Sequence, residues 1–186
     1  MPEEPGLANL DARMSILLDE NGIRATIERL AGEIAASVPR GTPLGMIGIR
    51  SRGDDLARRL IALLERGGLK NVPLGTVDIT MYRDDLAEIG PSAVVRTTEI
   101  PFDVAGRFIV LVDDVIHTGR SIRAALSAII DLGRPQAIRL AVLVDRSGRE
   151  LPIQPDFFGV RTEGRDRHVS VMLRETSGKD LVEVGP

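Results

Sequence analysis

The chain has 186 residues, of which 43% are hydrophobic, and this size and composition favour one globular domain. The formal net charge of −3 gives no overall support for polyanion binding, although a local basic face is possible. The absence of cysteine excludes a disulfide framework and a thiolate metal site. No apolar run approaches the length of a membrane span, and the acidic stretch at 1–10 predicts a loose tail, not a signal peptide. We therefore expect a cytoplasmic protein without a membrane partner.

Alternating strands and helices are predicted along the first half of the chain. A short strand at 13–18 precedes a helix that Asp19 or Asn21 caps. A second strand at 44–49 leads through residues 50–53 into a second helix. The inward-facing apolar residues of these two helices recur at helical spacing, at Ile23, Ile27, Leu30, Ala31, Ile34 and Val38, and then at Leu56, Leu60, Ile61 and Leu64.

The second half continues this alternation. Strands are predicted at 74–80, 108–112 and 138–144, and a helix that ends at Gly133 lies between the last two. Strands that alternate with helices predict the α/β class, with a doubly wound, mainly parallel sheet and right-handed crossovers. Because ligands of such sheets bind at the carboxyl ends of the strands, the loops that follow the strands are expected to meet at one edge.

Two stretches break the alternation within a single domain that spans 11–186. The connection at 81–102 is long and lacks periodicity, which predicts a flexible lid loop with Arg83 and Arg96 as candidates to reach a ligand. A small β hood from about 146 to 186, completed by the N-terminal strand, is predicted over the strand ends. Its signal is the alternation of apolar residues at Val169, Val171 and Leu173 and again at 181–184.

The most informative stretch is FIVLVDDVIHTGRS, from Phe108 to Ser121. Its first five residues form an apolar, β-branched run that is typical of a strand buried on both faces. Asp113 and Asp114 follow where this strand is expected to end, and a short loop from His117 onward opens a helix. The order is therefore strand, acidic pair, short Thr/Gly/Ser loop and helix.

Each part of this stretch suits one end of a phosphorylated sugar. A loop that opens a helix presents free N–H groups, Thr118 and Ser121 add hydroxyl donors, Arg120 adds charge and Gly119 permits a positive φ. The two upstream carboxylates accept hydrogen bonds from vicinal hydroxyls, so ribose 5-phosphate fits. Taken singly, an acidic pair is also typical of a solvated turn, and a Thr-Gly pair of an ordinary helix start. The ordered combination favours a phosphoribosyl site.

These residues resemble the phosphoribosyl-diphosphate (PRPP) motif of type I phosphoribosyltransferases. A narrower resemblance, to the PyrR family of bifunctional pyrimidine-operon regulators and uracil phosphoribosyltransferases, covers most of the chain from about Leu18. It rests on the run VLVDDVIHTGRSIRAAL together with DITMYRDDL at 78–86, LGRP at 132–135, LAVLVDR at 140–146 and RELPI at 149–153.

The resemblance implies a glycosyltransferase that converts uracil and PRPP to UMP and pyrophosphate. Asp113, Asp114 and Arg52 would be the catalytic residues, with the two aspartates on the ribose hydroxyls and the arginine on pyrophosphate. Mg²⁺ would be carried by the pyrophosphate without a dedicated protein cage. The base would lie near Asp145, Arg146 and Ile153. The implied PRPP- and nucleotide-binding residues are Ser51, Arg52, Gly53, Asp113, Asp114, Val115, Ile116, His117, Thr118, Gly119, Arg120 and Ser121.

The same resemblance implies homo-oligomers and UMP-responsive regulation through binding to pyrimidine-operon leader mRNA, with Arg29, Arg149 and Arg161 as the RNA candidates. This chain departs from the family pattern on that face. It reads ERLAGE at 28–33 where relatives commonly show TRIAHE, and the segment after residue 144 lacks a His, an Arg and a Lys. Fewer cations weaken contacts with RNA phosphates. A transferase without RNA regulation and a non-catalytic nucleotide sensor therefore stay open as alternatives.

Overall fold

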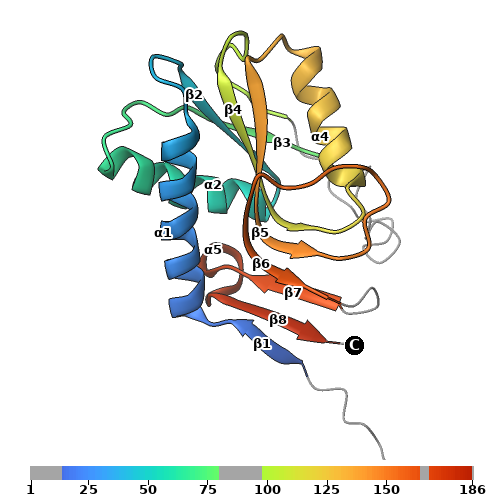
Figure 1. The fold of residues 1–186 in the computed structure, drawn as a ribbon. Helices are drawn as coiled ribbons and strands as arrows, with labels where there is room; N and C mark the ends of the chain where they lie inside the picture. Colours follow the sequence, from blue (N-terminus) through green and yellow to red (C-terminus); the bar gives the residue numbers. More distant parts are fainter. Residues whose placement is uncertain (1–13, 80–97, 164–167, 186) are drawn as a thin grey trace, which may run out of the picture.

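A five-stranded parallel sheet forms the centre of the computed structural model, which describes residues 14–79, 98–163 and 168–185 (Figure 1). The strand order is β3-β2-β4-β5-β6, and every neighbouring pair is parallel. This order places β4, which carries the acidic pair, in the middle of the sheet. The strands are β2 (Leu44–Ile49), β3 (Leu74–Val77), β4 (Phe108–Ile116), β5 (Ala137–Arg146) and β6 (Phe157–Thr162).

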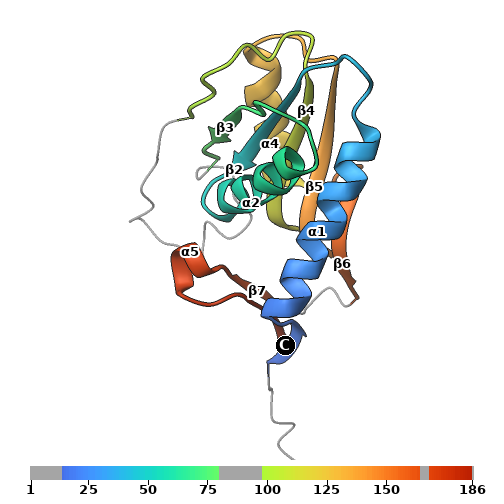
Figure 2. The same ribbon diagram turned by 90° about the vertical axis from the view of Figure 1, so that its left-hand side faces the viewer.

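Helices cover both faces of this sheet, with α1 (Glu20–Ser37) and α2 (Arg52–Arg66) on one side and α4 (Arg120–Asp131) on the other (Figures 1 and 2). Strand β4 shows why both faces are buried. Its residues Phe108 and Val110 pack with α1 and α2, whereas Ile109 and Leu111 pack with α4. Successive side chains of a strand point to opposite faces, so an unbroken apolar run fills two layers of core. The α/β fold class predicted from the sequence is confirmed.

Helix α1 begins as its sequence predicts. Asp19 is the N-cap, and its carboxylate accepts a hydrogen bond from the Gly22 N–H at 2.7 Å. This bond satisfies one of the free donors of the first turn. The predicted apolar stripe faces the core through Ile23, Ile27, Leu30, Ala31 and Ile34, all of which are buried.

A separate three-stranded antiparallel sheet forms the hood, in the order β1-β8-β7. Its elements are β1 (Ser15–Leu18), β7 (His168–Met172) and β8 (Leu181–Gly185), with the short helix α5 (Arg174–Ser177) between the last two strands. The sequence placed the hood from about residue 146 onward. In the structure β5 continues to Arg146 and β6 joins the main sheet, so only the later strands and β1 form the hood.

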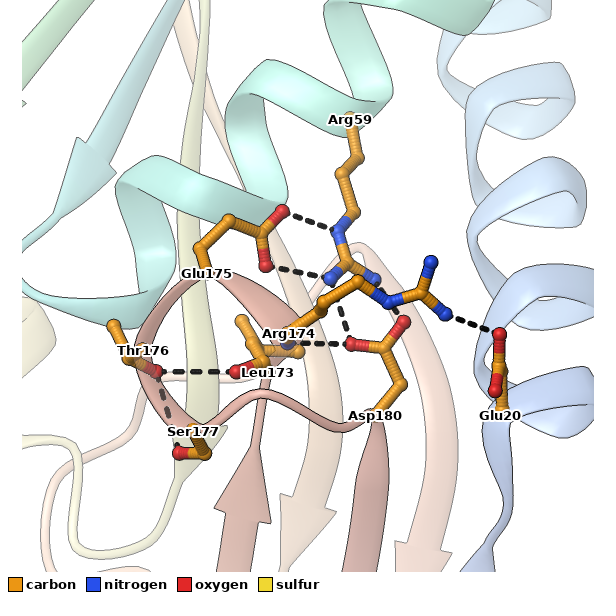
Figure 3. A network of polar contacts seen from close by, with 8 residues as sticks. All are labelled: Glu20, Arg59, Leu173, Arg174, Glu175, Thr176, Ser177 and Asp180. Carbon is orange, nitrogen blue, oxygen red and sulfur yellow. Dashed lines mark hydrogen bonds and ion pairs between the residues drawn. The ribbon is translucent and has the colours of Figure 1, made fainter.

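An arginine clamp, which consists of Arg59, Glu175 and Asp180, ties the hood to α2 (Figure 3). The Arg59 guanidinium donates four hydrogen bonds to the two carboxylates, at 2.6 to 3.0 Å. Hydrogen bonding to Arg59 lowers the pKa of Glu175. Burial acts in the opposite direction on Asp180, but the hydrogen bonds from Arg59 and from the Arg174 N–H hold its pKa below the usual value. A second ion pair, between Arg174 and Glu20, joins the hood to α1.

Strand β4 is longer than its apolar run predicts. Asp113 and Asp114 do not end the strand but lie within it, because pairing with β5 continues through Asp113↔Val142 to Ile116↔Asp145. Strand β3 ends earlier than predicted, at Val77.

None of the described helices combines the length and apolar character needed to cross a membrane.

Candidate active site

The carboxyl ends of β2, β4 and β5 meet at one edge of the sheet, as predicted. The parallel register pairs Gly48 with Val112 and Val115 with Val144, so the loops that follow these strands lie side by side. They border a cavity of about 510 Å³, a size typical of small-ligand sites. Its walls include Ile49, Arg52, Ile79, Asp113, Asp114, Val115, Ile116, His117, Gly119, Ser121, Ile122 and Arg146, together with residues 168–171 of the hood.

Two glycines bring the start of α2 onto the ends of the strands. A Cβ atom at Gly48 would lie 2.3 Å from the Asp54 Cα atom, and a Cβ atom at Gly53 would lie 2.3 Å from the Val112 carbonyl oxygen. No larger residue fits at either position without moving the backbone. The resemblance implied that Gly53 binds PRPP, and the structure shows that this glycine also permits close packing of α2 on β4. Ser51 precedes the helix and does not line the cavity.

The acidic pair forms the floor of the cavity. Asp113 is buried, and its carboxylate accepts a hydrogen bond from the Asp114 N–H at 2.9 Å. Asp114 accepts one from the Val115 N–H at 2.9 Å and pairs with Arg52 at 3.1 Å. The predicted pyrophosphate residue thus contacts a predicted ribose residue directly. Carboxylates held in this way are acceptors that suit the hydroxyl groups of a sugar.

The loop after β4 turns through a glycine with positive φ directly before α4 begins. Gly119 adopts φ +93°, as predicted, and is the N-cap of α4. The Thr118 hydroxyl accepts a hydrogen bond from the Arg120 N–H, so it shapes the turn and does not line the cavity. The Arg120 side chain is exposed and pairs with Glu150 at 2.7 Å. The residues of this loop that line the cavity are therefore His117, Gly119 and Ser121, the last two at the start of α4.

The predicted base-binding residues are divided by the structure. Arg146 lines the cavity, whereas Asp145 is only 3% exposed and does not line it. Ile153 packs close to Gly119 of the loop after β4 and does not line the cavity. The hood adds four wall residues that the sequence analysis had not assigned to the site: His168, Val169, Ser170 and Val171. The alternation along this segment indicates a strand, but it does not indicate what the strand covers.

The lid region is described only at its end. Arg83 and Arg96 lie outside the described residues. Nearer the C-terminal end of the predicted loop, Glu99 forms a bridge with Thr76 and pairs with Arg50 at 3.0 Å. This contact attaches the returning chain to the edge of the sheet beside the cavity.

The three candidate RNA-binding arginines each make intramolecular contacts. Arg29 donates to the Phe158 and Gly159 carbonyl oxygens of β6 and pairs with Glu33 at 2.7 Å. Arg149 and Arg161 both pair with Asp145, at 2.5 Å and 2.9 Å. Arg161 also lies over the Phe158 ring, 4.6 Å from its centroid.

Within residues 14–79, 98–163 and 168–185, no group of three or more metal-ligating side chains is arranged to hold an ion. Among the described residues that line the cavity, the carboxylates are the two on β4, and one of them already pairs with Arg52.

Comparisons with known proteins agree with this geometry. A sequence model described as "Phosphoribosyl transferase domain" matches residues 14–173. Hypoxanthine phosphoribosyltransferase of Trypanosoma cruzi shares the fold, with a TM-score of 0.70 at 20% identity over 92% of this chain and 97% of the solved chain. The "Bifunctional protein PyrR" of Pelotomaculum thermopropionicum is 49% identical over 170 residues, which is 90% of this chain and 93% of that protein. The protein of the same name from Deinococcus radiodurans is 46% identical and covers 94% of this chain.

The fold and the cavity at its carboxyl edge therefore define a phosphoribosyltransferase, and the chain belongs to the PyrR family within that class.

Proposed function

We propose that this protein transfers a phosphoribosyl group from PRPP to uracil, giving UMP and pyrophosphate. The observation that carries the proposal is the cavity in which the Asp113–Asp114 pair, buried at Asp113 and partly buried at Asp114, stands beside the start of α4. One end of this cavity presents carboxylate acceptors, and the other presents backbone donors and the positive end of a helix dipole. A ribose ring that carries a phosphate matches both ends at once.

In the proposed reaction, the bond between C1′ and the pyrophosphate oxygen breaks and a bond between C1′ and N1 of uracil forms. Pyrophosphate leaves with the electron pair, and the proton of uracil N1 passes to solvent water. Because positive character develops on the sugar, carboxylates at the ribose hydroxyls stabilise it and hold it in line. Arg52 moves from Asp114 to the departing pyrophosphate, where its guanidinium offers charge-assisted hydrogen bonds.

Mg²⁺ would enter this site on the pyrophosphate oxygens of PRPP, with water completing its coordination, because Mg²⁺ retains waters and binds substrate phosphates. The metal would supply charge neutralisation for the leaving group. The residues of this chain hold the sugar, the phosphate and the base against it.

Uracil as the acceptor is supported by the strong likeness to PyrR proteins, and the base would stand between Arg146 and the hood residues 168–171. The test is to supply PRPP with uracil, cytosine, hypoxanthine, guanine and adenine separately and to measure pyrophosphate release. We expect release with uracil alone. Release with a purine base and none with uracil would overturn the proposed acceptor, while leaving phosphoribosyl transfer in place.

A second function, UMP-responsive regulation of pyrimidine-operon expression by binding leader mRNA, is favoured by relatives that are named bifunctional and match over 90% or more of this chain. The measurement is a titration with leader RNA and a scrambled RNA at two salt concentrations, with and without UMP. Regulation predicts binding that requires the leader sequence and increases with UMP. Weak binding that is equal for the leader and the scrambled RNA and that falls steeply with salt would instead indicate a transferase without RNA regulation. Tight UMP binding without turnover would indicate a nucleotide sensor.

A further inference from the structure

Two successive carbonyl groups of the loop after β4, those of His117 and Thr118, are held by one other segment. In a loop whose N–H groups face a ligand, the carbonyls face the protein and need donors there. The His117 carbonyl accepts a hydrogen bond from the Arg149 guanidinium. The next carbonyl, that of Thr118, accepts from the Glu150 and Leu151 N–H groups at 3.0 and 3.1 Å. Residues 149–151 therefore fix the outer side of the loop.

Arg149 also reaches the end of β5. Its guanidinium pairs with Asp145 at 2.5 Å and donates to the Arg146 carbonyl oxygen at 3.3 Å. The Arg149 side chain is only 14% exposed, so its contacts are shielded from water and are stronger than those of a surface ion pair. One side chain thus joins the strand that leads to the base end of the cavity with the loop at the phosphate end.

A glycine with positive φ, Gly148, allows this segment to lie directly against the loop. At Gly119 a Cβ atom would lie 3.5 Å from the Arg149 Cδ atom, which is an ordinary contact. A Cβ atom at Gly148, which adopts φ +108°, would lie 2.6 Å from the His117 Nε2 atom. Because Gly148 has no side chain, the turn can pack directly against the His117 ring.

Arg161 provides an internal comparison. It binds the same carboxylate, Asp145, at 2.9 Å, but its side chain is 58% exposed and its other described contact is with the Phe158 ring. Both arginines neutralise Asp145, whereas Arg149 in addition holds a carbonyl of the loop. The two residues separate the effect of neutralising a buried carboxylate from the effect of positioning the loop.

We propose that Arg149 is a positioning residue for the phosphate end of the site. By binding Asp145 and the His117 carbonyl together, it fixes the loop so that the N–H groups at the start of α4 face the 5′-phosphate before the ligand arrives. This inference rests on the proposed phosphoribosyl site. It gives Arg149 an internal role, where the family resemblance had suggested contact with RNA.

The test is calorimetric binding of ribose 5-phosphate and of uridine to the full chain and to four variants. R149K keeps a cation for Asp145 but offers one ammonium group in place of a fork, so it cannot make both contacts. R149Q removes the charge as well. R161Q removes the other cation from Asp145, and R139Q removes a similar pair, Arg139–Asp156, from elsewhere on β5. Melting temperatures show whether each variant is folded.

We expect R149K to melt close to the wild-type temperature and to bind ribose 5-phosphate about tenfold more weakly, as fits the loss of one charge-assisted hydrogen bond. The affinity for uridine, which has no phosphate, should fall by less than about twofold. R161Q should lose less affinity for ribose 5-phosphate than R149K, and R139Q should match the wild type. In turnover, the KM for PRPP should rise in R149K and R149Q more than the KM for the base.

Three results would overturn the proposal. The first is a folded R149K that binds ribose 5-phosphate as the wild type does. The second is an equal loss in R161Q, which would assign the effect to the charge on Asp145. The third is an equal loss for uridine, which would assign it to general damage. Failure of the proposed acceptor is distinct from all three, because ribose 5-phosphate carries no base and its binding needs no turnover.

Discussion

Two of the arginines on helix α2, Arg52 and Arg59, form ion pairs with different consequences. Arg52, the first residue of the helix, makes one hydrogen bond to Asp114 at the cavity. Arg59 lies seven residues later, about two helical turns along, and makes four hydrogen bonds to Glu175 and Asp180 in the hood. The first pair joins two parts of one site, and the second joins two sheets of the fold.

The difference between them is the number of contacts that must be broken for the arginine to move. Arg52 is 38% exposed and can exchange one carboxylate for a phosphate with little loss. Arg59 is 21% exposed, and moving it would leave Asp180, at 9% exposure, without its cation. Similar chemistry on one helix thus gives a contact suited to substrate exchange and a contact suited to holding the hood in place.

The largest expected effect comes from the acidic pair that Arg52 contacts. The double variant D113N/D114N should lower the rate of UMP formation by about 100-fold or more, because amides replace the carboxylates that would hold the ribose. The measurement is product formation from uracil and PRPP. D156N, which alters a carboxylate at the other end of β5, is the control and should retain activity. Equal rates for D113N/D114N and the wild type would refute the assigned roles.

The next effect concerns stability. R59A should lower the free energy of unfolding by about 2 kcal/mol, because it removes charged hydrogen bonds and leaves carboxylates unpaired. Chemical denaturation measures this change, and the melting temperature should fall by about 4–8 °C. The KM for PRPP should stay close to wild type at temperatures where the variant is folded. If R59A were as stable as the wild type, the clamp would not hold the hood.

Arg52 should show the reverse pattern. R52Q should raise the KM for PRPP by about tenfold, through loss of a charged contact to pyrophosphate, with little change in unfolding free energy. R58Q is a matched control, since Arg58 lies on the same helix, is exposed and pairs with Asp54 at 3.6 Å. A KM that changes equally in both variants would contradict a specific role for Arg52.

The smallest effect is the pH dependence of the arginine clamp. The pKa values of Glu175 and Asp180 are lowered in the folded protein, so their contribution to stability is present above the unfolded values, near pH 4, and is lost as the pH falls through the folded values. The stability difference between wild type and R59A should therefore be full at pH 7 and shrink below about pH 4. A difference that does not change between pH 7 and pH 3 would show that charge is not its source.

The sequence predicted the parts of the fold whose cause is local. The apolar run from Phe108, the acidic pair and the loop with Gly119 specify a buried strand and a turn with positive φ, and the structure has both. Asp19 was predictable as a cap because its side chain acts within one turn of its own helix. The meeting of three loops at one edge followed from the parallel topology alone.

Features that depend on distant partners were not predictable from spacing. Strand β6 was missed because it is an edge strand, interrupted by Gly159 and carrying the exposed Arg161. The hood residues 168–171 line the cavity only because the hood folds back over the strand ends. Nothing in the spacing of Asp145 and Arg149 indicated that the arginine would reach the His117 carbonyl.

The most direct test of the central claim is a crystal structure of the protein with UMP bound. The account predicts that the ribose hydroxyls donate hydrogen bonds to Asp113 and Asp114 and that the phosphate accepts from the N–H groups at the start of α4. A nucleotide bound elsewhere, or a phosphate turned away from that helix, would contradict it.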